Sequence, residues 1–183
     1  DKETQDAIKE LAPTMAKVSA ERIQVELVKL LTSDHPEMMR NLYELGLTKV
    51  FMPEFDVMMQ TPQNNKHHMY SVGEHTIRTL MNVRADKVLR LTMLLHDVAK
   101  PVCITTDEEG QDHFKKHPAV GADMTKQILR RLKFDNKTID CCCRLVKEHD
   151  DRPQITPKNV RRAMSRIGAG LFPMLFEVKR ADM

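Results

Sequence analysis

Along most of the chain, apolar residues recur at intervals of three and four, which predicts amphipathic helices rather than strands. We expect a first helix over residues 3–17, bent or broken at Pro13 because proline interrupts helical hydrogen bonding. Ser19 is a good N-cap for a second helix, over residues 20–31. A third helix opens at Pro36 and ends at the glycine of "YELG".

The middle of the chain is less regular. Residues 47–69 hold no steady period and are interpreted as a long functional loop with short turns. Further helices are expected over residues 73–83, 86–100, 118–132, 137–148, 157–167 and 171–182. Gly110 lies in a turn that could join two short strands, a small hairpin within residues 102–114. The predicted fold class is therefore all-α, a helical bundle with one small hairpin.

Composition agrees with packed helices. The 183 residues suffice for one domain, or for one domain with a helical appendage, and 41% of them are hydrophobic. Aromatic residues make up only 4% and tryptophan is missing, whereas methionine numbers 13. A core built from Leu, Ile, Val, Ala and Met favours helices over a sandwich of strands.

The four cysteines do not predict disulfides. Three are consecutive, at 141–143, and Cys103 stands alone, so neither a disulfide framework nor a zinc ribbon is indicated. Reduced cysteines fit a cytoplasmic protein, and neither a signal peptide nor a membrane span is recognisable. Because the chain starts with Asp1 rather than Met, we expect it to be part of a longer protein.

Charge is distributed unevenly. The net charge of +3 combines +6 from residue 122 onward with −3 before it. A basic C-terminal third favours an acidic partner such as RNA, although a solvated helix face explains the same charges. The candidate RNA-binding residues are Lys126, Arg130, Arg131, Lys133, Arg161, Arg162 and Arg166.

The stretch "LLHDVAKP" places His96 and Asp97 at the end of an apolar run. One interpretation is a helix end emerging into water, with Lys100 favourable there and Pro101 stopping the helix. The other is a buried site, where a carboxylate needs a charged partner or a metal. Helical spacing puts more residues of ligand type on inward faces, and imidazole with carboxylate suits a first-row divalent metal. These residues are His75, His117, His149 and Asp182.

This order of ligand-type residues resembles the HD-domain superfamily of metal-dependent phosphohydrolases, whose defining order is His, His-Asp, Asp. More narrowly, "VSAERIQVELVKLL", "LYELGLTKVFMPEFD", "VGEHT", "LLHDVAKP", "GQDHFKKHPAVGA" and "ILRRLKFDNKTID" are similar to the C-terminal half of bacterial CCA-adding tRNA nucleotidyltransferases. The resemblance implies a helical neck over residues 1–50 and an HD domain over 51–183. The Gly-Ser motif and paired aspartates of that family's catalytic head have no counterpart here, so the resemblance implies that this chain does not itself add nucleotides.

The resemblance also implies roles. His75, His96, Asp97 and Asp182 would hold a first metal; Asp97 would bridge to a second, held by His117 and His149. Asp97 and Lys100 would be the catalytic pair, Lys100 holding a phosphate oxygen as a point charge. His68, in the loop before the metal helix, could contact substrate or simply be exposed. Mn, Ni, Fe or Co is favoured over Mg because several ligands are imidazoles, and Zn stays open.

The implied function is hydrolysis of nucleotide or RNA-end phosphates, such as a 2′,3′-cyclic phosphate or a 2′-phosphate. One alternative is a non-catalytic arm that grips tRNA through phosphate contacts. Another is a stand-alone HD nucleotidase with the neck as an oligomerisation arm, against which the neck motif argues. The expected partners are tRNA, another RNA 3′ end or nucleotides, with no membrane and with an oligomer left open.

Overall fold

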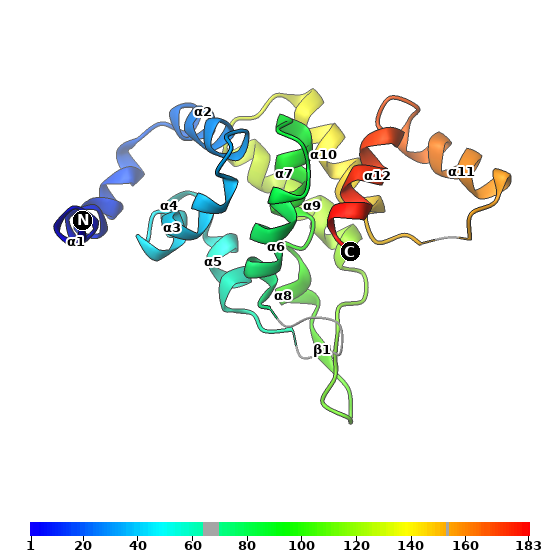
Figure 1. The fold of residues 1–183 in the computed structure, drawn as a ribbon, viewed down its shortest axis with the longest axis horizontal. Coiled ribbons are helices and arrows are strands. Elements are labelled where there is room, and N and C mark those ends of the chain that lie inside the picture. The colour runs from blue at the N-terminus through cyan, green and yellow to red at the C-terminus, as the bar shows by residue number, and fades with distance from the viewer. Residues whose placement is uncertain (64–69, 153) are drawn as a thin grey trace.

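A computed structural model describes residues 1–63, 70–152 and 154–183 of the chain. Its N-terminal third is a series of short helices joined by tight turns (Figure 1). They are α1 (Lys2–Leu11), the 3-10 helix η1 (Ala12–Lys17), α2 (Ala20–Leu31), the 3-10 helix η2 (Pro36–Met38), α3 (Met39–Glu44), α4 (Thr48–Phe51) and α5 (Pro53–Gln60).

The remainder is a bundle of mostly longer helices with one antiparallel hairpin among the described residues. Its elements are α6 (Val72–Met81), α7 (Lys87–Leu95), α8 (Lys100–Cys103), β1 (Thr105–Thr106), β2 (Asp112–His113), α9 (His117–Arg131), α10 (Asn136–Glu148), α11 (Pro157–Ile167) and α12 (Phe172–Ala181). The predicted fold class, all-α with a small hairpin, is confirmed.

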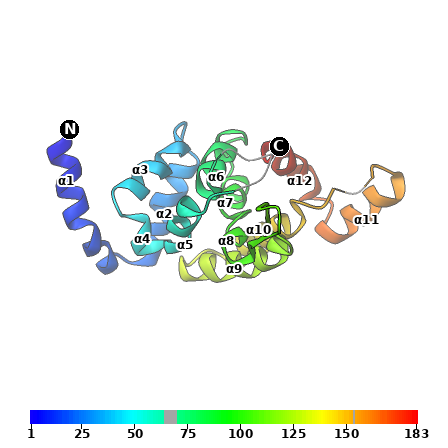
Figure 2. The same ribbon diagram turned by 90° about the horizontal axis from the view of Figure 1, so that it is seen from below.

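Helix α7 is the centre of the bundle. It contacts α2, α6, α10 and α12, and every residue from Leu89 to Leu95 is buried. A helix that is buried on all sides must be enclosed by other elements, and here Arg90 and Thr92 are buried along with the apolar residues. Its nine residues are too few for a bilayer, and no helix among the described residues is long and apolar enough to cross one. Figures 1 and 2 place α1 and α11 at opposite ends of the molecule, with α7 between them.

Several local predictions are confirmed. The first helix breaks next to Pro13, where α1 gives way to η1. Gly110 has φ of 78° in the turn between the two strands, a conformation that glycine adopts without strain. Helix α11 has the predicted bounds, because the Thr156 side chain accepts a hydrogen bond from the Asn159 N–H at its start and Gly168 follows its end.

Two predictions of local structure are wrong. The part of the presumed long loop up to residue 60 is helical, as α4 and α5, because Phe55 and Met58 are completely buried and Pro53 starts α5. The helix expected to continue through Lys100 ends at Leu95, and a turn follows before α8. Pro101 lies in the first turn of α8, where its missing N–H costs nothing, so it starts a helix rather than stopping one.

Candidate metal centre

The turn after α7 supplies two adjacent residues of the site, His96 and Asp97. His96 and Asp97 are completely buried there, although a polar helix end would ordinarily reach water. The end of α7 therefore does not emerge into solvent. The residues that His96 and Asp97 contact indicate what these two side chains could bind.

A first group of ligand-type atoms gathers from three parts of the chain. Asp182, just after α12, places its Oδ1 atom 3.0 Å from His75 Nε2 and 3.1 Å from His96 Nε2. The Asp97 Oδ2 atom lies 3.3 Å from His96 Nε2 and 3.8 Å from His75 Nε2. One potential ligand atom from each of these four residues lies within 4.8 Å of the others, a suitable spacing around one ion.

A second group lies on the other side of the same carboxylate. Asp97 Oδ1 is 3.4 Å from His117 Nε2 and 3.7 Å from His149 Nε2. His117 is the first residue of α9, with Lys116 as the N-cap, and His149 is the C-cap of α10. The two oxygens of Asp97 thus face different histidine sets, and this carboxylate is shared between the groups.

Backbone carbonyls orient three of the imidazoles. The Nδ1–H groups of His96, His117 and His149 donate to the carbonyl oxygens three residues earlier, at 2.7, 2.8 and 2.7 Å. Because a carbonyl can only accept, the proton is on Nδ1 and Nε2 is left facing the cluster. Such bonds commonly orient histidine ligands of metals.

The donor set fits a metal ion on two observations. Neither oxygen of Asp97 accepts a hydrogen bond of good geometry from the described residues, although this carboxylate is buried. The Nε2 atoms of His117 and His149 lie only 3.2 Å apart, and with both Nδ1 atoms donating elsewhere they need a proton or a cation between them. Imidazole nitrogens with carboxylate oxygens suit a first-row divalent metal.

The electrostatics agree with a cation site. Burial alone raises the pKa of Asp97, but the charges of His96 and Lys100 outweigh it and hold that pKa well below its usual range. Asp182 behaves similarly: burial raises its pKa, and the hydrogen bonds from His75 and His96 together with the charge of His96 outweigh burial and lower it. Burial lowers the pKa of His96, yet Asp97 and Asp182 raise it to about 10. Without metal a proton on His96 offsets part of the negative charge, and a divalent cation would displace that proton.

Lys100 extends the site toward solvent. Its Nζ atom forms a 2.8 Å ion pair with Asp97 Oδ2, and the residue is buried. A cleft of about 340 Å³ opens beside it, with His117 and Asp182 on its inner wall and Arg152 on its rim. The size suits a small phosphorylated ligand, because ligand pockets start at about 300 Å³.

The structure brings together all six predicted metal ligands and Lys100, and His68 lies outside the described residues. Sequence analysis missed Arg152, although it follows His149 by only three residues; its guanidinium is 3.8 Å from Asp182 Oδ2. It also missed Gln63, whose side chain reaches Lys100 from another segment. No local pattern marks such a contact.

The predicted RNA-binding residues do not form one surface. Four belong to α9 or the turn after it and three to α11, which Figures 1 and 2 place apart. All seven are exposed, but two have carboxylate partners. Arg131 pairs with Glu54 at 2.7 Å, and Arg166 pairs with both Glu148 and Asp151. These ion pairs reduce the charge that the two arginines offer to a partner.

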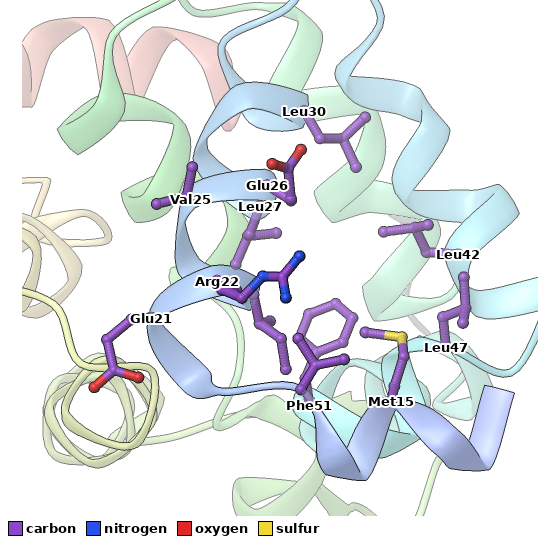
Figure 3. A pocket seen from close by; sticks show the side chains of 12 residues that line it. Met15, Glu21, Arg22, Val25, Glu26, Leu27, Leu30, Leu42, Leu47 and Phe51 are labelled. Carbon is purple, nitrogen blue, oxygen red and sulfur yellow. The ribbon is translucent and has the colours of Figure 1, made fainter.

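A second, larger pocket of about 720 Å³ lies between η1, α2 and the α3–α4 segment (Figure 3). Its wall is mainly apolar, with Met15, Leu27 and Phe51 among the side chains, and Arg22 also lines it. It contains none of the ligand-type residues described above. Size alone therefore does not identify the site of chemistry in this molecule.

Two known protein families match different parts of the chain. Residues 1–59 match the family described as the probable RNA and SrmB-binding site of polymerase A. Residues 66–178 match the HD domain family. The second match contains every ligand-type residue of the site except Asp182, which lies just beyond it.

Curated relatives share both parts. The chain is 32% identical over 169 residues to the CC-adding tRNA nucleotidyltransferase of Thermus thermophilus and 34% identical over 169 residues to the A-adding tRNA nucleotidyltransferase of Deinococcus radiodurans. Each alignment covers 88% of this chain and 38% of the relative. The multifunctional CCA protein of Actinobacillus pleuropneumoniae is 25% identical over 174 residues, covering 88% of this chain and 42% of the relative. The chain thus spans about two fifths of the length of these relatives, and it is homologous to CCA-adding tRNA nucleotidyltransferases over most of its own.

Proposed function

Because the chain belongs to the HD domain family, we propose that its histidine–aspartate cluster is the centre of a metal-dependent phosphohydrolase. One observation carries this proposal: the buried carboxylate of Asp97 turns one oxygen toward each of two histidine sets. A structural aspartate can be satisfied by one positive partner, whereas a carboxylate arranged in this way can offer one oxygen to each of two ions.

The residues divide into two ligand sets. His75, His96, Asp97 and Asp182 would hold one metal, and Asp97, His117 and His149 a second. A metal bound by these residues would lower the pKa of a bound water toward neutrality and would neutralise charge on phosphoryl oxygens. Four imidazoles favour Mn, Ni, Fe or Co over Mg, which prefers oxygen ligands.

The protein's own part is to position the substrate phosphate. The Lys100 ammonium lies at the boundary between the ligand sets and the cleft, where it can hold a phosphate oxygen. Arg152 on the rim adds a second cation. We propose as substrates nucleotide or RNA-end phosphates, including 2′,3′-cyclic phosphates and 2′-phosphates, because the relatives named above act on tRNA.

The first prediction concerns metal. After treatment with a chelator, the chain is expected to be inactive toward a 2′,3′-cyclic nucleotide, and Mn²⁺, Ni²⁺, Fe²⁺ or Co²⁺ should restore hydrolysis. Metal content by mass spectrometry and the thermal midpoint should rise together, because an ion that binds only the folded state stabilises it. Failure of all four ions on cyclic nucleotides, 2′-nucleotides and RNA with a cyclic phosphate end would contradict the proposal.

A second candidate function, RNA binding, has an observation of its own. The neck helix α2, the start of α7 and the turn after α9 border a groove of about 550 Å³, whose lining includes Lys29, Lys87, Lys133 and Asp135. Lys87 pairs with Asp135 at 3.4 Å and Lys29 with Glu26 at 2.9 Å, so among the described residues Lys133 is the lysine of this groove that has no carboxylate partner. The Gln24 amide donates to the Lys133 carbonyl oxygen across the groove, at 3.0 Å. An unpaired lysine beside a segment that matches an RNA-binding family favours a phosphate contact there.

Replacing Lys133 with alanine tests this surface. The loss should remove about one phosphate contact, so tRNA affinity should fall and the salt slope of log K should decrease by about 1. Hydrolysis of a small cyclic nucleotide should not change, because Lys133 does not line the cleft. Arg131→Ala is the matched control: its guanidinium already pairs with Glu54, and a smaller effect is expected. Equal effects of the two variants would exclude the groove as the contact surface.

A further inference from the structure

The Lys100 ammonium has a more elaborate environment than the proposed chemistry requires. Besides its 2.8 Å ion pair with Asp97, it donates a hydrogen bond to Gln63 Oε1 at 3.0 Å. It also lies 5.4 Å from the centre of the Phe114 ring, within the range of a cation–π contact. An ammonium has three N–H donors. Among the described residues Gln63 accepts a hydrogen bond from it, and Asp97 attracts it as an ion pair without a hydrogen bond of good geometry, so donors remain for a ligand in the cleft.

Gln63 is itself fixed. It comes three residues after the end of α5 and is buried, with 5% of its surface exposed. Its Nε2 atom donates to the carbonyl oxygen of Tyr70 at 3.3 Å. Since an ammonium can only donate and a carbonyl can only accept, these neighbours determine which way the amide points. Gln63 therefore cannot turn its oxygen away from Lys100 without losing both bonds.

Tyr70, whose carbonyl oxygen accepts the hydrogen bond from Gln63, is held against α6, the helix that carries His75. The Arg78 guanidinium stacks over the Tyr70 ring at 3.9 Å, and Arg78 lies one turn after His75 on α6. The Val72 N–H donates to the Thr61 carbonyl oxygen at 2.9 Å, which ties the chain before Gln63 to the start of α6. The position of the Gln63 amide is thus coupled to the helix that carries a predicted metal ligand.

We propose that Gln63 is a positioning residue, which holds the Lys100 ammonium at the cleft wall for a phosphate oxygen. The hydrogen bond to Gln63 draws the Lys100 ammonium away from Asp97, so that not all of its N–H groups point toward that carboxylate. This matters because Asp97 also belongs to the first ligand set. Pre-ordering a long side chain in this way reduces the entropy lost when the anion binds. This inference rests on the proposed function for the identity of the anion.

A double-mutant cycle tests it. Inorganic phosphate binding is measured by calorimetry, on metal-free and Mn²⁺-loaded chain, for the wild type, Gln63→Met, Lys100→Met and the double variant. Gln63→Met has nearly the same volume but no acceptor for the ammonium; we expect phosphate to bind about tenfold more weakly, as for the loss of one charged hydrogen bond. Lys100→Met should bind at least as weakly, and adding Gln63→Met to it should change nothing further.

The controls separate positioning from structure. Gln60→Met replaces an exposed glutamine at the end of α5 that lines neither the cleft nor the neck groove, and it should leave phosphate affinity unchanged. Metal content and thermal midpoint of Gln63→Met should stay close to the wild type. An equal cost of Gln63→Met with and without Lys100, loss of metal, unchanged or tighter binding, or no phosphate binding by the wild type would each overturn the inference. Phosphate binding without any hydrolysis would instead reject the proposed function and leave this inference standing.

Discussion

Asparagine at position 97 is expected to remove both metals and to lower hydrolysis by about a thousandfold or more. The Asp97→Asn side chain keeps the volume of the buried carboxylate but loses its charge, and one of its two polar atoms becomes an NH₂ donor that cannot bind a cation. Because both ligand sets share this residue, one substitution weakens both. Metal content by mass spectrometry and turnover of a 2′,3′-cyclic nucleotide measure the two losses separately.

Two other variants make the Asp97→Asn experiment decisive. His149→Gln alters only the second set, so it should lose one ion and keep the first. Asp140→Asn changes an exposed aspartate, paired with Arg144 on the helix that leads to His149, and should keep both ions and full activity. If Asp97→Asn still bound metal and hydrolysed substrate like Asp140→Asn, the shared-carboxylate interpretation would be wrong.

The second large effect is on stability, at Gly73. A β-carbon added there would lie 2.7 Å from both the Cα and the backbone nitrogen of Met59 on α5, closer than real atoms approach. Alanine usually stabilises a helix interior by about 1 kcal/mol relative to glycine, but here α6 would have to move away from α5. We expect Gly73→Ala to lower the free energy of unfolding by about 2–3 kcal/mol and the thermal midpoint by about 5–10 °C.

This displacement should also reach the metal site, because His75 lies two residues further along α6. Metal affinity of the first ligand set should therefore fall along with stability. Gly170→Ala is the control, since a β-carbon there meets no heavy atom within 4 Å and the midpoint should hardly change. Thermal unfolding of both variants, with and without Mn²⁺, measures the effect; a Gly73→Ala midpoint at or above the wild type would show that α5 and α6 can separate freely.

Local signals predicted much of the secondary structure. Thr156, Pro157 and Gly168 delimit α11 because a cap, a proline in the first turn and a terminal glycine all act within the segment itself. The same approach failed for α4 and α5, which are four and eight residues long. Helices this short are marginal in isolation, and tertiary burial of Phe55 and Met58 stabilises α5.

For the basic residues, the sequence did not show which side chains are free to bind RNA. Arg131 and Arg166 look equivalent to Arg130 and Arg161 in the sequence, and all four are exposed. Only the fold shows that Glu54 pairs with Arg131 and that Glu148 and Asp151 pair with Arg166. Ion pairs between distant segments leave no periodic pattern, so charge along the chain overestimates the charge available to RNA.

By itself, the sequence determined that the chain is helical, that its ligand-type residues follow the HD order, and beside or on which helices they lie, because spacing and capping act over a few residues. The tertiary structure decided that α7 ends at the site, that each oxygen of Asp97 faces its own histidine set, and that Gln63 reaches Lys100. These facts depend on ångström-scale distances between segments that are far apart in the chain. Only packing of the bundle sets such distances, because no short-range preference fixes them.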